Sequence, residues 1–462
     1  MNTSSLWSLR LGFSNKQSSA IQKIGIEAFL NKSFSSKIDY LVPQLLEQEP
    51  KTIEELKTLR QKIKNLPQEK VEILIKQQAK TGIELRKWWL SKMQEEEFPL
   101  REKMTCFWHN HFVSTLQKVK VNYWVYQHNM ILRENAFGNF KELTKKVIET
   151  NAMVKYLDNV DNKKGALNEN LSRELLELFT IGIGNYSELD IKNGAKALAG
   201  LTIGNEKAAY RKRIEDNDEV IYFSQKGVFK ANDLVDIIFK QEKTPYLITE
   251  KLLKWFIYDN PSKELIKYYG DYFRKVDFEI QPLLFKIFTE EFTKNTSGSK
   301  IKDPLTYSLQ IIDQLNINNF NQEMLVFFLK QQGMDLMNQP NVKGWGGGNN
   351  WLTSQIYLQR NNVTDLLCSG NNINRRVFKN LEDEPKISLE KIKVKVNWNQ
   401  NSNNKAIIKE LSDRLLFTVD ENIQKDMENI IKYDFDTHSD NADQVVLRLF
   451  NYITKLPEFQ LI

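Results

Sequence analysis

Apolar residues recur at every third or fourth position along most of the chain. The pattern is clearest in SSAIQKIGIEAFLNKSF (18–34), TIEELKTLRQKIKNL (52–66), VEILIKQQAKTGIELRKWWLSKM (71–93), LITEKLLKWFIYD (247–259) and IQPLLFKIFTEEF (280–292). This spacing gives a helix one apolar face that must be buried against other elements. The sequence therefore predicts a mainly α, multi-helix globular protein whose core comes from helix packing.

Strand patterns are few. The segment EVIYFSQKGVFK (219–230) has apolar clusters around a central glycine, which predicts a β-hairpin. The segment IKVKVNW (392–398) alternates with period two, which predicts a strand. No repeat of fixed period is visible, and this argues against a solenoid. We expect a small β-hairpin excursion on a helical body.

Three polar stretches, 205–218, 293–300 and 399–404, are candidate boundaries or exposed loops. A chain of 462 residues is long for one core, since a domain usually has roughly 100–200 residues. We divide it into an N-terminal helical region (1–100), a central helical core with the His and Asn-Glu-Asn motifs (101–204), an insertion with the hairpin (205–235), a helical region with a Gly/Trp-rich loop (236–398) and a C-terminal helical region (399–462).

Composition narrows the function classes. The 65 Lys and Arg residues exceed the 59 Asp and Glu residues by 6, and the two signs are interleaved. Because no basic stripe gathers on one element, nucleic acid is not an expected partner. No apolar run approaches the ~20 residues of a membrane span. Arg10 stands where the apolar core of an export signal should continue. Cys106 and Cys368 lie far apart in sequence and form no CxxC unit. We expect a soluble, cytoplasmic protein with no membrane partner.

The segment FWHNHF (107–112) carries His109 and His111. Imidazole is the commonest metal ligand and has an unperturbed pKa near neutrality. On a helix, however, residues two apart lie about 200° apart around the axis. Joint ligation would require the helix to end or distort near Asn110. The structural alternative is that one histidine makes a core hydrogen bond while the other faces a cleft.

The segment NENLSRELLELFTIGIGNY (168–186) predicts a helix that ends near Gly182 and Gly184. One stripe carries Leu171, Leu175, Leu178 and Phe179, and the opposite one carries Asn170, Arg173, Glu174 and Glu177. Arg173 can form an ordinary exposed ion pair with Glu169 or Glu177. Alternatively, Glu174 and Glu177 direct two carboxylates into one cavity, as in the carboxylate metal sites of helical proteins.

Two further stretches concentrate polar residues. YQHNMILRENAFGNFKEL, which begins at Tyr126, contains His128, Asn129, Arg133 and Asn135, the residue types of buried networks and active sites. QPNVKGWGGGNNW (339–351) lacks the residue order of known phosphate-binding loops. We expect Trp345 and Trp351 to pin this glycine-rich loop to the body, with Lys343 at its mouth. No GxSxG, HExxH or Walker sequence is present.

The motifs LREKMTCFWHNHF, LRENAFGNFKEL, NAMVKYLDN, NENLSRELLELFTIGIGNYSELDIKNGAKALAGLT, QPNVKGWGGGNNW and ITKLPEFQLI occur in this order. In this respect the chain resembles the bacterial family called domain of unknown function 1800. The resemblance assigns motif positions to His109 and His111, to Asn168, Glu169, Asn170, Arg173, Glu174 and Glu177, and to Lys343, Gly344 and Trp345.

The resemblance also implies a protein partner from a sulfatase- or phosphatase-like family, because members are commonly encoded beside one. Many members carry an export signal, which is not visible in this chain. Many also have a His-Asp pair before a Lys-x-x-x-Gly turn, where this chain has Ser224 and Gln225. If that pair ligates a metal or relays a proton, this protein is a divergent member.

Two functions follow as hypotheses. The first is a metal-assisted hydrolase in which His109, His111, Glu174 and Glu177 hold a divalent metal ion or act as general acid and base, with Arg173 beside them. Asn168, Glu169, Asn170, Arg133, Lys343 and Trp345 would then bind the substrate. The second is a non-enzymatic binding or scaffold protein in which the His, Asn, Arg and Glu cluster forms a buried network. Convergence of the four candidate metal ligands in one pocket would favour the first.

Overall fold

The computed structural model describes residues 1–374, 391–432 and 435–462. Within these residues it contains 22 α-helices and two small, two-stranded antiparallel sheets, so the predicted mainly α fold is confirmed. Nearly all buried hydrophobic residues of this part of the chain, from Leu6 to Ile462, pack into one connected cluster. Among the described helices, none combines the length and the hydropathy that a membrane span needs.

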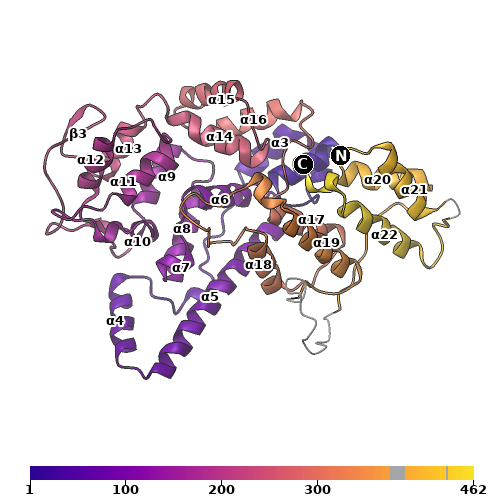
Figure 1. The fold of residues 1–462 in the computed structure, drawn as a ribbon, viewed down its shortest axis with the longest axis horizontal. Coiled ribbons are helices and arrows are strands. Elements are labelled where there is room, and N and C mark those ends of the chain that lie inside the picture. The colour runs from indigo at the N-terminus through magenta and orange to yellow at the C-terminus, as the bar shows by residue number, and fades with distance from the viewer. Residues whose placement is uncertain (375–390, 433–434) are drawn as a thin grey trace.

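The N-terminal helices are α1 (Thr3–Leu11), α2 (Ser18–Ile24), α3 (Ile26–Phe34), α4 (Ile53–Lys64) and α5 (Gln68–Glu95). Thr52 and Glu55 form a capping box at the start of α4, and Pro67 precedes α5. Helix α4 and the first half of α5 project from the body as an arm, whereas the second half of α5 packs into the core (Figure 1).

The central helices are α6 (Leu100–His111), α7 (Leu116–Val119), α8 (Asn122–Glu134), α9 (Phe140–Ile148) and α10 (Asn151–Tyr156). Helix α6 lies near the middle of the molecule (Figure 1) and is buried on nearly every face. This placement explains why its segment is rich in large aromatic residues, which fill the space between neighbouring helices.

The next region contains α11 (Asn170–Glu174), its π-helical continuation η3 (Leu175–Thr180), α12 (Glu188–Leu198) and α13 (Ala231–Ile238). Strands β1 (Leu201–Thr202) and β2 (Ala209–Tyr210) form one sheet, and β3 (Val220–Tyr222) and β4 (Gln225–Gly227) form the other. The predicted hairpin is therefore present, with Val220 opposite Gly227. The polar stretch 205–218 contains β2, which the loop prediction missed.

The remaining helices are α14 (Thr244–Phe256), α15 (Lys263–Lys275), α16 (Ile280–Phe292), α17 (Pro304–Gln314), α18 (Gln322–Gln331), α19 (Ser354–Cys368), α20 (Asn404–Leu415), α21 (Glu421–Ile431) and α22 (Ala442–Thr454). Short 3₁₀ turns are η1 (Gln44–Leu46), η2 (Asn159–Asp161), η4 (Gly348–Trp351) and η6 (Pro457–Gln460). Helices α20 to α22 form one end of the molecule (Figure 1).

The strand predicted at 392–398 is wrong, because the structure assigns no strand there. Burial still alternates, since Val396 is buried between two exposed neighbours. However, the backbone N–H groups of Ile392 and Lys395 donate to the carbonyl oxygens of Gly370 and Leu315, which belong to no strand. Alternation reports one buried face, and a strand also needs a neighbouring strand for its hydrogen bonds.

Candidate functional site

Three histidines are buried, and each donates its Nε2–H to a backbone carbonyl oxygen. The acceptors are Ser114 for His109 at 2.9 Å, Phe179 for His111 at 3.1 Å and Phe112 for His128 at 2.8 Å. Because a carbonyl oxygen can only accept, Nε2 must carry the hydrogen, and Nδ1 of the neutral ring is then an acceptor. Burial lowers the pKa of His109 to about 3, that of His128 to about 4 and that of His111 well below its ordinary value. All three rings are neutral near pH 7.

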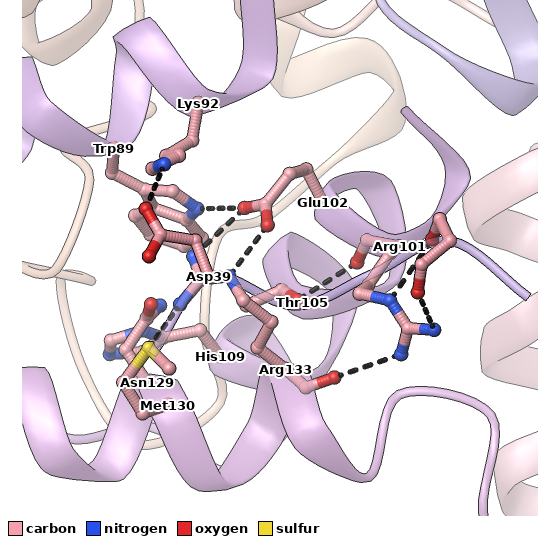
Figure 2. Close-up of polar contacts among 11 residues, drawn as sticks. Asp39, Trp89, Lys92, Arg101, Glu102, Thr105, His109, Asn129, Met130 and Arg133 are labelled. Atoms are coloured by element: carbon pink, nitrogen blue, oxygen red, sulfur yellow. Dashed lines mark hydrogen bonds and ion pairs between the residues drawn. The ribbon is translucent and has the colours of Figure 1, made fainter. Parts of the chain in front are cut away.

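His109 belongs to a buried polar network among α5, α6 and α8 (Figure 2). Its Nδ1 accepts a hydrogen bond from the Asn129 side chain at 3.1 Å. Beside it, Arg133 makes two bonds of 2.6 and 2.8 Å to the Glu102 carboxylate, which also accepts from the Trp89 indole at 2.9 Å. Arg133, a predicted binding residue, therefore links α8 to α6 through Glu102. Such a contact agrees with the hypothesis that the cluster is a buried structural network.

His111 has quite different surroundings, as its angular separation from His109 predicts. Its Nδ1 accepts from the Lys251 ammonium at 3.1 Å, and Lys251 also donates to the Leu178 carbonyl oxygen at 2.8 Å. The last carbonyl groups of a helix lack partners within it. At the end of η3, His111 and Lys251 supply partners for Phe179 and Leu178. His111 is therefore the member of the histidine pair that contacts α11 and its continuation η3. We call these two elements, which carry Glu174 and Glu177, the acidic helix.

The exposed side of that helix is an ion-pair cluster. Arg173 lies 3.1 Å from Glu169, 3.4 Å from Glu177 and 3.1 Å from Glu188. Glu177 also accepts from the Tyr186 hydroxyl at 2.6 Å. These side chains are partly or largely exposed, so each pair contributes little to stability.

The two asparagines of the motif lie at the start of α11. The side-chain oxygen of Asn168 accepts from the backbone N–H of Asn170 at 3.0 Å, as turn-forming asparagines do. Asn170 itself is exposed. Both residues therefore shape the entry to the helix.

Glu174 differs from Glu177. Its Oε2 atom is buried and has no hydrogen-bond partner within the described residues. Burial is the main reason that the pKa of Glu174 is raised, and the negative charge of Glu177 adds to the shift. Arg173 and Lys343 act in the opposite direction. Lys343 is therefore close enough to influence this carboxyl group electrostatically.

A cleft of about 280 Å³ lies between α6, α14 and the glycine-rich loop after α18. We call it the Lys/Trp cleft. Its lining residues in the described structure are Phe107, Asn110, His111, Lys251, Lys254, Trp255, Asp259, Lys300, Lys343, Trp345, Gly346, Gly347, Gly348 and Trp351. Lysines outnumber carboxylates here, and Trp255 and Trp345 stack with ring centroids 6.5 Å apart. Of the predicted site residues, the cleft brings together His111, Lys343 and Trp345.

Asn110 fastens the loop to α6. Its side-chain oxygen accepts from the backbone N–H of Trp345 at 2.7 Å. Gly344 has a φ of +85°, and a Cβ atom there would lie 2.4 Å from Asn110 Oδ1. Trp345 and Trp351 are buried, so they pin the loop as predicted. The three residues His109, Asn110 and His111 thus contact the core, the loop and the acidic helix respectively.

The charges of the cleft are unevenly neutralised. Lys254 pairs with Glu250 at 2.6 Å, and Lys300 lies 3.8 Å from Asp259. Neither Lys251 nor Lys343 has an ion-pair partner within the described residues. In the same part of the chain, the backbone N–H groups of Gly346, Gly347 and Gly348 donate no hydrogen bond. Ammonium groups and consecutive free N–H groups are the donors that bind anions.

Sequence reasoning missed Lys251. The signal was present, because Lys251 lies three residues after Ile248 and four before Trp255, which are both on the buried stripe of α14. A lysine on an otherwise apolar stripe indicates a polar partner or a cavity.

The family model described as a protein of unknown function (DUF1800) matches residues 6–461. The chain belongs to the DUF1800 family. No curated protein and no solved structure matches it.

In this DUF1800 chain, Ser224 lies in the tight turn between β3 and β4, where Phe223 and Ser224 have positive φ angles, and Gln225 is the first residue of β4. Neither residue lines the Lys/Trp cleft. Across the described residues, no group of three or more His, Cys, Asp or Glu side chains is placed to hold a metal ion. The metal site at His109, His111, Glu174 and Glu177 stays a prediction from sequence. In His109 and His111, both ring nitrogens already have hydrogen-bond partners within the protein.

Proposed function

We propose that this protein binds a small anionic ligand in the Lys/Trp cleft, and that its His, Asn, Arg and Glu cluster is a buried structural network. One observation carries the proposal. Within the described residues, the ammonium groups of Lys251 and Lys343 have no carboxylate partner, and the N–H groups of Gly346, Gly347 and Gly348 have no acceptor. All five residues line the same cavity. An anion would neutralise the two ammonium groups and accept hydrogen bonds from the three glycine N–H groups.

The walls of the cleft support this assignment. Trp255, Trp345 and Trp351 are all nearly buried and line the cavity. Aromatic walls exclude water, and a lower local dielectric strengthens the attraction between an ammonium group and an anion. A volume of about 280 Å³ suits a ligand of a few heavy atoms more than a macromolecular segment.

Calorimetric titration tests the proposal, with inorganic phosphate and glycolate as probes at low ionic strength. We expect saturable binding of at least one probe, and weakening of about 10-fold in Lys343→Gln, because one ammonium group is worth about 1.4 kcal/mol or more in a charge-assisted bond. Lys405→Gln is the matched control, since Lys405 is an exposed lysine outside the cleft. The absence of saturable binding, or equal weakening in both variants, would overturn the proposal.

A metal-assisted hydrolase is the second candidate, and Glu174 is the observation that favours it. A carboxyl group with a buried, unpartnered oxygen and a raised pKa is suited to proton transfer or to contact with a cation. Elemental analysis of the purified protein tests this candidate. A stoichiometric divalent metal that disappears in Glu174→Gln would support it, and a metal-free protein with no affinity for added Zn²⁺ or Mn²⁺ would reject it.

A further inference from the structure

Lys251 differs from the other lysines of the Lys/Trp cleft in its partners. Its Nζ atom donates to two uncharged acceptors, His111 Nδ1 at 3.1 Å and the Leu178 carbonyl oxygen at 2.8 Å. A tetrahedral nitrogen has four directions, of which one holds the side-chain carbon and two are used by these bonds. The fourth direction carries either a third proton or the lone pair of a neutral amine. Lys251 lines the cleft, which places its side chain beside any ligand bound there.

We propose that Lys251 is a nucleophilic amine that forms an imine with the carbonyl group of an anionic ligand, such as a small 2-oxo acid or a phosphorylated aldehyde. The inference rests on the proposed function, because the same cleft must first hold the anion. Lys343 and the glycine N–H groups would hold the anionic group, while the carbonyl carbon faces Lys251.

The electrostatics of the cleft favour the neutral amine. Burial lowers the pKa of Lys251 to about 8, and the charge of Glu250 offsets only part of this effect. Desolvated lysines of this kind serve as Schiff-base nucleophiles in enzymes.

The step balances without an oxidant or a reductant. The nitrogen lone pair attacks the carbonyl carbon and forms the N–C bond. Both protons of the amine pass to the carbonyl oxygen, which leaves as water when the C–O bond breaks and the C=N bond forms. The two acceptors on Nζ orient the amine before the attack.

Lys254 is the comparator within the same chain. It lies on α14, lines the same cleft and is three residues from Lys251, but its ammonium group is paired with Glu250 at 2.6 Å. A reagent in the cleft can thus reach both Lys251 and Lys254, but the two amines have different hydrogen-bond and ion-pair partners.

The experiment incubates the full chain with glyoxylate and cyanoborohydride, which reduces an imine to a stable carboxymethyl-lysine, and maps the labelled peptides by mass spectrometry over time. We expect Lys251 to be labelled at least about 10-fold faster than Lys254, because the Lys254 ammonium group is held in its ion pair with Glu250 whereas Lys251 has only uncharged acceptors. Lys251→Arg should lose this fast phase and keep the slow labelling elsewhere. Its circular dichroism spectrum would show that it is folded.

Labelling of Lys251 at or below the rate of Lys254 would overturn the inference. Glycolate distinguishes a failure of the imine inference from a failure of the proposed anion site, because it carries the carboxylate of glyoxylate without the carbonyl group. Saturable glycolate binding without fast labelling would reject the imine and keep the anion site. If glycolate did not bind and Lys251 were not labelled fast, both the imine and the anion site would be rejected.

Discussion

The Lys251 ammonium donates to Nδ1 of His111 at 3.1 Å, while Nε2 of the same ring donates to the Phe179 carbonyl oxygen at 3.1 Å. One imidazole therefore joins α6, α14 and the end of η3. The arrangement requires a neutral ring, because a protonated Nδ1 could not accept from an ammonium group. His111 positions the amine that faces the Lys/Trp cleft, so the stability of this junction and the chemistry of the cleft are coupled.

Removing the His111 ring should destabilise the protein. In His111→Ala, the Phe179 carbonyl group and one Lys251 N–H lose their partners, and the contacts of the buried ring are lost. We expect the free energy of unfolding to fall by about 2–4 kcal/mol. Urea unfolding measures it. His438→Ala, at an exposed histidine, should change it by less than about 0.5 kcal/mol. Equal stability of the two variants would contradict this role of His111.

The stability should fall as the pH is lowered from about 7 to about 5. An unfolded histidine has a pKa near 6.5, whereas burial holds the pKa of His128 at about 4. Between these values the unfolded chain binds more protons, so the free energy of unfolding rises with pH. His128 alone should contribute about 2 kcal/mol between pH 5 and pH 7. The full effect is present above pH 6.5 and is lost as the pH falls towards 4.

Unfolding titrations at several pH values check this dependence. His128→Gln should flatten the slope, because glutamine does not titrate. His438→Gln should leave the slope unchanged, since the His438 side chain is exposed and is not part of the buried core. A slope that is the same in all three proteins would show that His128 is protonated without resistance from the fold.

Local sequence patterns predicted those features that depend on neighbouring residues. The 200° separation of His109 and His111 follows from helix geometry, and the structure gives them different partners. The ion pairs of Arg173 follow from i to i+4 spacing.

Features that depend on distant residues were not predictable in this way. Lys251 and His111 are 140 residues apart, and Asn110 and Trp345 are 235 residues apart. No periodicity links such positions, because they meet only after the helices have packed. The strand error at 392–398 has the same cause, since the pattern shows one buried face but not whether another strand lies beside it.

Arg133 and Arg173 should differ strongly in their effect on stability. Arg133→Met leaves the Glu102 carboxylate buried without its cation, which should cost about 3–5 kcal/mol. Arg173→Met removes partly exposed ion pairs and should cost less than about 1 kcal/mol. Chemical denaturation gives both values. The double variant Arg133→Met, Glu102→Gln should recover part of the loss, because no unpaired charge then remains. Similar costs for the two arginines would contradict the structural role of Arg133.

Gly344 should be required for the attachment of the glycine-rich loop. In Gly344→Ala the new Cβ would lie 2.4 Å from Asn110 Oδ1 and 2.5 Å from the Asn110 backbone oxygen, at a φ of +85°. Gly333→Ala is the control, because Gly333 has a φ of +78° with no atom within 4 Å of the added carbon. Both variants carry the strain of the left-handed conformation, about 1 kcal/mol.

Only Gly344→Ala adds the collision with α6, so it should lose a further 1–3 kcal/mol or so of stability. Because the loop carries Lys343 and the three glycine N–H groups, this variant should also bind phosphate or glycolate more weakly than Gly333→Ala does. Thermal unfolding and calorimetry separate the two effects. If Gly344→Ala lost stability but kept its affinity, the loop N–H groups would not contribute to anion binding, and the lysines alone would carry it.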